Sequence, residues 1–192
     1  GKNQPASGHW LEICLPKVAL HSKDTESEIF VWNNDVVDSR VPQITRRYGN
    51  VRLIQADPAE KLTHPHAVPL QRLYEVARKE RVKYIVTLDN DAFPIKDGWL
   101  SHLTGALDDK TVLAGIWRDE LADAITPYIH PSCLCTTVDF IESRKLRFDT
   151  VDISPEAKVD TLSVFTRVAT AANLKVHKLH RTNRNQVHRL MA

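Results

Sequence analysis

The clearest pattern of hydrophobic and polar positions lies at residues 82–100. Residues 82–88 are mostly β-branched, aromatic or aliphatic, and predict a strand that is apolar on both faces, as in the middle of a covered parallel sheet. The run stops on Asp89-Asn90-Asp91, and a turn that contains Pro94 then leads to a helix that starts at Trp99. The sequence therefore predicts a buried strand whose carboxyl end carries two acidic side chains.

Strand and helix patterns alternate along the rest of the chain. Short runs rich in Val, Ile and Leu predict strands at 29–32, 51–54, 111–117 and 174–179, and an extended segment at 129–137. Apolar residues at helical spacing predict helices near 7–19, 41–48, 70–77, 99–107, 138–143 and 161–172. Such alternation is typical of an α/β fold with a parallel sheet, so we expect residues 1–192 to form a single domain.

Polar clusters follow two of the predicted strands. Asn33-Asn34-Asp35 comes after the strand at 29–32, as Asp89-Asn90-Asp91 comes after its own strand, and open α/β sheets bind ligands beyond such ends. Carboxylates at i and i+2 repel one another unless a cation lies between them, and Mg²⁺ or Mn²⁺ prefers such oxygen ligands. Asp and Asn also form ordinary turns, so the tripeptide has a structural alternative.

Composition and charge narrow the classes of function. The chain has 42% hydrophobic and 26% charged residues, as in soluble globular proteins, and its net charge of +2 argues against a dedicated nucleic-acid binder. The sequence has no apolar run long enough to span a membrane and no signal-peptide core at its start. The odd number of cysteines favours buried, reduced thiols and a cytoplasmic protein. These residues are Cys14, Cys133 and Cys135.

The order of these motifs resembles the GT-A-fold glycosyltransferases, in particular the large inverting family 2 that uses nucleotide-diphosphate sugars. The resemblance runs from about His9 to Arg181. It includes the strand before Asn33-Asn34-Asp35, the loop at 56–69, and the strand that ends in Asp89-Asn90-Asp91 with Pro94 and Gly98-Trp99-Leu100 after it. It implies a three-layer α/β/α fold with a mostly parallel central sheet.

The resemblance also implies a chemistry: inverting displacement that moves a sugar from a nucleotide-diphosphate donor, with a UDP-sugar favoured, to a hydroxyl of a carbohydrate or glycolipid. Asp89 and Asp91 would hold Mn²⁺ or Mg²⁺, which neutralises the departing diphosphate. Asp160 would be the general base, although Asp is also a preferred helix N-cap. The nucleotide-sugar would contact residues at both strand ends, namely Asn33, Asn34, Asp35, Asp89 and Asn90.

Two departures from the family lead to an alternative. The family's first strand is missing before Ser7, and its metal-binding His has no clear counterpart among His177, His180 and His188, so the chain resembles a transferase truncated at both ends. The alternative function is therefore a non-catalytic core that binds nucleotide or a partner only. A nucleotidyl transferase would need a Gly-rich phosphate loop, which is absent.

Three histidines are further candidates. His130, followed by Pro131-Ser132, could shape the acceptor side of a site, although a His beside Pro is more often a loop feature. His64 and His66 could form a metal pair, but they lack an Asp or Cys neighbour in sequence.

Overall fold

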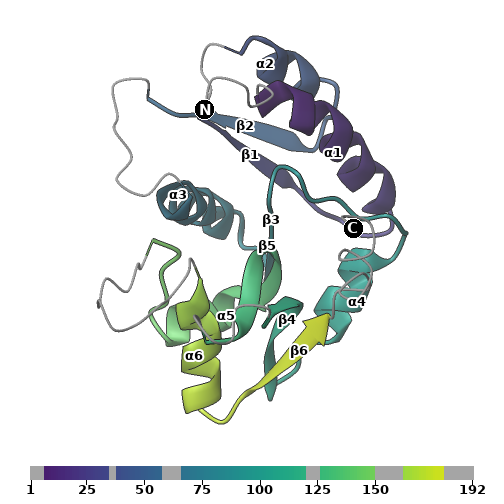
Figure 1. Ribbon diagram of the computed structural model, residues 1–192. Coiled ribbons are helices and arrows are strands. Elements are labelled where there is room, and N and C mark those ends of the chain that lie inside the picture. The colour runs from purple at the N-terminus through teal and green to yellow at the C-terminus, as the bar shows by residue number, and fades with distance from the viewer. Residues whose placement is uncertain (1–6, 35–37, 58–65, 120–125, 150–161, 180–192) are drawn as a thin grey trace, which may run out of the picture.

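The computed structural model describes residues 7–34, 38–57, 66–119, 126–149 and 162–179 (Figure 1). Helices and strands alternate through most of this part of the chain, as the sequence predicts. The helices are α1 (Ser7–His21), α2 (Arg40–Thr45), α3 (Ala67–Ala77), α4 (Trp99–Gly105), α5 (Val138–Ser143) and α6 (Ser163–Ala171), with a 3₁₀ turn, η1 (Arg78–Glu80). The strands are β1 (Ile29–Asn33), β2 (Val51–Gln55), β3 (Tyr84–Leu88), β4 (Thr111–Arg118), β5 (Tyr128–Thr137) and β6 (Lys175–Leu179).

The described strands form two sheets. β1 and β2 pair in parallel, and a four-stranded sheet has the order β3-β5-β4-β6. β5 is antiparallel to both β3 and β4, whereas β4 and β6 are parallel. The protein is therefore α/β with parallel and mixed pairing. The expectation of one mostly parallel sheet is wrong for the described strands, because the extended run at 129–137 inserts in the opposite direction.

The position of β3 also differs from the expectation. Among the described strands it lies at an edge of the four-stranded sheet, not in its middle. Its residues are nonetheless covered on both faces, since Ile85 packs against one core cluster and Val86 and Leu88 against another. Helices pack on both faces of the sheet at this strand and bury its side chains on both sides. This explains why the strand is apolar throughout, although it lies at an edge.

The two core clusters lie on opposite faces of the four-stranded sheet. Figure 1 shows α3, α5 and α6 on one side of it and α4 on the other. The larger cluster joins α3, α5 and α6 to the sheet, through Tyr74, Phe140 and Phe165 respectively. The smaller one packs Leu103 of α4 against Ala114 and the two cysteines of β5. These layers leave the ends of the strands as the places where polar side chains gather.

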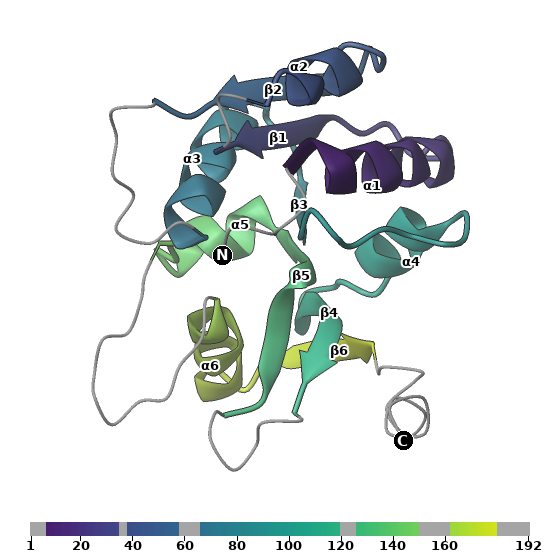
Figure 2. The same cartoon turned by 45° about the horizontal axis from the view of Figure 1, so that its top comes forward.

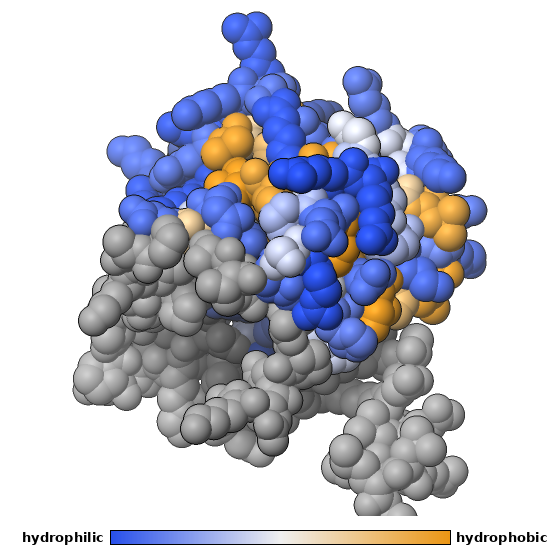
Figure 3. All heavy atoms as spheres, turned by 90° about the horizontal axis from the view of Figure 1, so that it is seen from above, coloured by the Kyte–Doolittle hydropathy of each residue, from blue (hydrophilic) through white to orange (hydrophobic). Residues whose placement is uncertain are grey.

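α1 packs against α2 and lies beside β1, above the four-stranded sheet in the view of Figure 2. It buries Cys14 and Leu15, while Trp10, Ile13 and Leu20 stay partly exposed. Seen from above, the molecule is largely hydrophilic, with separate hydrophobic patches (Figure 3). No helix in the described ranges has both the length and the apolar character that a membrane span needs.

A wide bulge interrupts the pairing of β4 with β5. Gly115 of β4 pairs with Leu134 of β5, and Trp117 pairs with Ile129. β4 therefore advances by two residues where β5 advances by five. Residues 130–133 of β5, which include His130 and Ser132, thus lie opposite the single residue 116 of β4. Gly115 permits this arrangement, because a Cβ at that position would lie 2.1 Å from the carbonyl oxygen of Cys133.

Candidate functional site

The carboxyl ends of β1 and β3 both lie against α3. The imidazole Nε2 of His66, at the N-cap position of α3, is 3.5 Å from Oδ1 of Asp89, which follows β3. Farther along α3, the guanidinium of Arg72 lies over the ring of Trp32 in β1, 5.5 Å from its centre. The helix thus brings together two strand ends that the sequence analysis singled out separately.

Asp89-Asn90-Asp91 forms a turn, in which the amide of Ala92 donates to the carbonyl oxygen of Asp89. The side chain of Asp89 is 22% exposed, while Asn90 and Asp91 are exposed. Burial, and to a smaller extent the negative charge of Asp91, raise the pKa of Cys14 in α1. The neighbours of the two carboxylates therefore come from different helices, α3 for Asp89 and α1 for Asp91.

The amides at the end of β1 have local partners. Asn33 is 3% exposed and its Nδ2 donates to Oε1 of Gln55 in β2 over 3.1 Å. Oδ1 of Asn34 accepts a 2.6 Å hydrogen bond from Nε1 of Trp32. Asn33 ties β1 to β2, and Asn34 orients the indole that Arg72 covers. Their contact with a nucleoside stays a prediction.

The bulge of β5 lies next to the acidic turn. Leu88 pairs with Cys133, so the next residue on each strand is Asp89 and Ser132. Oγ1 of Thr87 donates to the carbonyl oxygen of Pro131 over 2.6 Å and holds the bulge against β3. Nδ1 of His130 accepts from the backbone N–H of Ser132 over 3.2 Å and lies 2.8 Å from its Oγ. The role of His130 on the acceptor side of a site, considered from the sequence beside that of a loop residue, stays a prediction.

The described residues do not form a complete metal cage. No group of three or more His, Cys, Asp or Glu side chains in this part of the chain lies close enough to hold a metal ion. A cation at Asp89 or Asp91 would need oxygen ligands from a bound molecule. This is how Mg²⁺ usually binds, through one or two carboxylates and the phosphates of a substrate. The residues present therefore fit a shared metal site and not a protein-only one.

Two predicted site residues, Asp35 and Asp160, lie outside the described residues, as do His64, His180 and His188. The cap position of α6 is occupied by Leu162. The first turns of α6 contact the start of β5, because the N–H of Ile129 donates to Oγ1 of Thr166 over 3.0 Å. The assignment of Asp160 as a general base stays a prediction.

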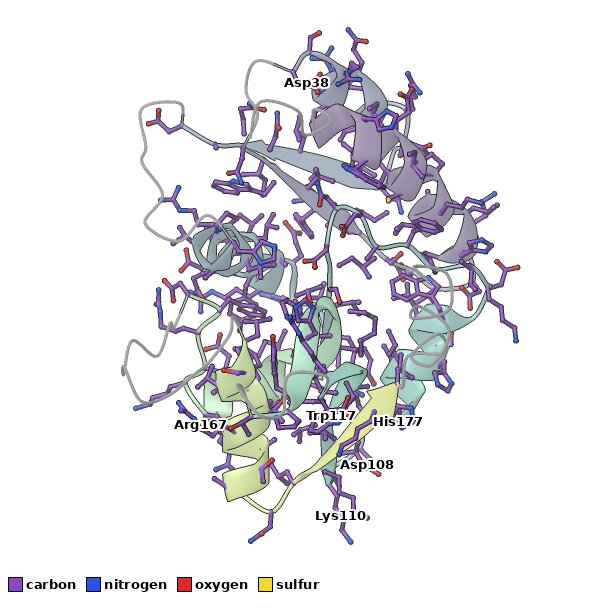
Figure 4. The ribbon with its side chains drawn as sticks, viewed as in Figure 1. Asp38, Asp108, Lys110, Trp117, Arg167 and His177 are labelled. Carbon is purple, nitrogen blue, oxygen red and sulfur yellow. The ribbon has the colours of Figure 1, made fainter. Side chains whose placement is uncertain are left out.

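The remaining candidates are structural or remote from the acidic turn. Cys133 and Cys135 are buried and unpaired with each other, and burial raises their pKa to about 11 and about 12, which confirms the prediction of buried thiols. His177 lies on β6 (Figure 4), at the opposite edge of the four-stranded sheet from β3, and its ring centre is 5.5 Å from that of His102. It is not brought to the acidic turn.

Comparison with known proteins finds no family model and no curated protein that matches this chain. The α/β architecture and the geometry around Asp89 are accordingly the grounds for any functional proposal.

Proposed function

We propose that the chain binds a nucleotide-diphosphate sugar together with Mn²⁺ or Mg²⁺, and transfers the sugar to an acceptor hydroxyl with inversion. The observation that carries this proposal is the acidic turn, Asp89-Asn90-Asp91, which directly follows a strand covered on both faces and lies against the amino end of α3. Ligand sites in α/β folds form beyond such strand ends.

The metal would be held jointly by the protein and the donor. Asp91 is exposed and can reach a cation directly, while Asp89 already contacts His66. When bound, the cation would neutralise charge on the leaving diphosphate. Because the described carboxylates do not make a cage, we expect the metal alone to bind weakly and the metal with a nucleoside diphosphate to bind much more tightly.

The nucleoside would lie toward β1. Trp32 and the Arg72 guanidinium that lies over its ring would line this side, with Asn34 as a hydrogen-bonding neighbour of the indole, and Arg72 adds a positive charge. Arg and His side chains from α3 would then lie on the phosphate side, where charge-assisted hydrogen bonds are strong. Asp160 would activate the acceptor hydroxyl.

A second function, binding of nucleotide or a partner without turnover, is favoured by one observation. Within the described residues no strand joins β1–β2 to the four-stranded sheet, so the two halves of the proposed donor site lie on separate sheets. A purified protein that binds UDP and Mn²⁺ but does not transfer any sugar in assays with a panel of UDP-sugars and acceptors would support this second function.

The test is calorimetric titration of UDP and then GDP, each with and without Mn²⁺, into the wild type and Asp91→Asn. We expect one nucleotide to bind in a metal-dependent way, and Asp91→Asn to abolish that binding while the melting temperature stays within a few degrees. Asp109→Asn, a change at another exposed carboxylate, is the matched control. Binding that is unchanged in Asp91→Asn, or absent from the wild type, would contradict the proposal.

A further inference from the structure

His102 and His177 form a pair of imidazoles on the face of the four-stranded sheet that α4 covers. Their ring centres are 5.5 Å apart and the ring planes are inclined by 69°. His102 belongs to α4 and is exposed, whereas His177 belongs to β6 and is partly buried. In the part of the chain that the structure describes, neither imidazole forms a hydrogen bond or an ion pair. Their ring nitrogens are therefore available to a ligand from solution.

The packing of neighbouring residues explains why the two rings meet. Leu179 of β6 packs into the smaller core cluster, and side chains two residues apart on a strand lie on the same face, so His177 also faces α4. The register agrees, because His177 pairs with Ala114, which belongs to the same cluster as Leu103. Leu103 is the residue after His102. The contact of α4 with the sheet therefore brings the two imidazoles together.

The separation of the rings suits a metal ion that both of them bind. Zinc binds imidazole nitrogen at about 2.0–2.1 Å, so the centres of two imidazoles on one tetrahedral ion lie about 5 Å apart. The observed separation of 5.5 Å is close to this value. Imidazole nitrogen suits Zn²⁺, Cu²⁺ and Ni²⁺, whereas Mg²⁺ and Mn²⁺ prefer oxygen ligands. The pair is thus matched to a transition metal and not to the ions expected at the acidic turn.

We propose that His102 and His177 together bind one divalent transition-metal ion, with Zn²⁺ as the best fit, and that this ion links α4 to β6. Two imidazoles leave two positions of a four-coordinate ion to water or a small ligand, so the site is an open one. It lies at the opposite edge of the four-stranded sheet from β3. The inference is therefore separate from the proposed sugar transfer.

Other potential ligands on the neighbouring elements are engaged or neutral. The carboxylate of Asp108, which follows α4, accepts hydrogen bonds from the backbone N–H groups of Lys110 and Thr111 over 2.8 and 2.6 Å. Burial raises the pKa of the Cys133 and Cys135 thiols, so they lack the thiolate form that zinc binds. The described residues accordingly offer a pair of ligands here and not a group of three.

A shared ion would hold the last described strand against α4. The two histidines are far apart in the sequence, and they meet only when β6 has paired with β4 and α4 has packed on the sheet. A ligand that binds the folded chain and not the unfolded chain stabilises the fold by mass action. Zinc would therefore stabilise the attachment of β6.

NMR of the histidine rings, with Zn²⁺ as the probe, tests the pair directly. We expect one equivalent of Zn²⁺ to shift the ring resonances of His102 and His177 together. Each resonance is assigned by its disappearance in His102→Gln or His177→Gln. Mg²⁺ should leave both rings unmoved, since it prefers oxygen ligands. Movement of only one of the two rings with Zn²⁺, or of neither, would overturn the proposal.

Calorimetric titration of Zn²⁺ measures whether the two imidazoles act as one site. We expect either single variant to weaken zinc binding about tenfold or more, because one arm of a two-armed contact is lost. The double variant should bind little more weakly than either single variant. His9→Gln is the matched control, since the ring of His9 contacts the indole of Trp10 and not an imidazole. Full binding by the single variants, or losses that add in the double variant, would overturn the shared site.

The outcomes separate this inference from the proposed function. Asp91→Asn should leave zinc binding unchanged while it abolishes the binding of UDP with Mn²⁺. Zinc binding through His102 and His177 with no binding of UDP or GDP would keep the inference and contradict the proposed function. Metal-dependent UDP binding with both rings unmoved by zinc would do the reverse.

Discussion

Nε2 of His66 lies 3.5 Å from Oδ1 of Asp89, and this contact joins the start of α3 to the end of β3. The two residues come from segments that the sequence separates by a helix and a strand. The side chain of His66 is 61% exposed, so water screens its charge and the contribution of the pair to stability is small. Because it lies beside the acidic turn, we expect it to matter more for the proposed ligand binding than for folding.

The first prediction concerns this pair. We expect His66→Gln to change the free energy of unfolding by less than about 1 kcal/mol, as for exposed pairs, and to weaken binding of UDP with Mn²⁺ several fold, because an imidazole nitrogen can bind phosphate or metal. Urea denaturation and calorimetry measure the two effects. The control is His9→Gln on α1, another exposed histidine. Unchanged binding in His66→Gln would remove His66 from the site.

The second prediction concerns Gly115. A Cβ at this position would lie 2.1 Å from the oxygen of Cys133 and 2.9 Å from Cγ2 of Ile129, and φ is +154°. We expect Gly115→Ala to lower the free energy of unfolding by at least about 2 kcal/mol, through overpacking and backbone strain.

The matched control for this change is Gly105→Ala in α4, where no atom lies within 4 Å of the new Cβ. Alanine is favoured over glycine in helices, so this variant should be as stable as the wild type or more stable by up to about 1 kcal/mol. Equal stability of Gly115→Ala and Gly105→Ala would show that the bulge can relax without cost.

The third prediction concerns the bond from Thr87 to Pro131. Thr87→Val keeps the shape of the side chain but leaves a carbonyl without this donor, and should cost about 1–3 kcal/mol. Thr136→Val is a matched change, because Oγ1 of Thr136 donates to the carbonyl of Val112 over 2.8 Å. We expect both variants to lose stability and only Thr87→Val, which lies beside the acidic turn, to weaken the proposed binding of UDP with Mn²⁺. Equal binding losses would indicate a general effect of destabilisation.

The fourth prediction is a pH dependence. Hydrogen bonds from the Arg40 side chain, with others from the backbone N–H groups of Arg40 and Gly8, lower the pKa of Asp38 from 3.8 to about 2. Figure 4 shows Asp38 at the top of the molecule, where α1 meets α2. Because the folded state binds this proton less tightly than the unfolded state, the stabilising contribution is complete above about pH 4 and is lost between pH 4 and 2.

Urea denaturation at a series of pH values measures this dependence. The wild type should lose more stability between pH 4 and 2 than Asp38→Asn, which has no carboxyl to protonate there. Asp109→Asn, at an exposed carboxylate, should follow the wild type. Parallel curves for Asp38→Asn and the wild type would show that Asp38 does not contribute to the acid sensitivity.

Much of the local structure could be predicted from the sequence, and the strand pairing could not. The β-branched run before Asp89 and the helical spacing after Trp99 gave elements close to those observed, because both signals are local. The direction and neighbours of β5 depend on contacts with residues far away in the chain. An extended segment with few alternating polar residues contains no information on which strand it will join.

The parts of the site missed from the sequence have similar physical explanations. The sequence predicts a loop at 56–69 that includes His66 and Pro69, but α3 already begins at Ala67. Proline is tolerated in the first turn of a helix, where the missing N–H needs no partner. The position of His130 depends on the bulge in β5. This bulge appears only as a difference in register between β4 and β5, which the sequence does not reveal.

The order of strands also has a consequence for the newly made chain. β6 is the last described strand and covers the outer edge of β4, while the residues that pair β4 with β5 come much earlier. During synthesis, the edge of β4 that pairs with β6 therefore stays without a partner strand until Leu179 has left the ribosome and its exit tunnel. Any chain that stops before Lys175 would keep that edge permanently, and would be prone to pair with other chains instead of with itself.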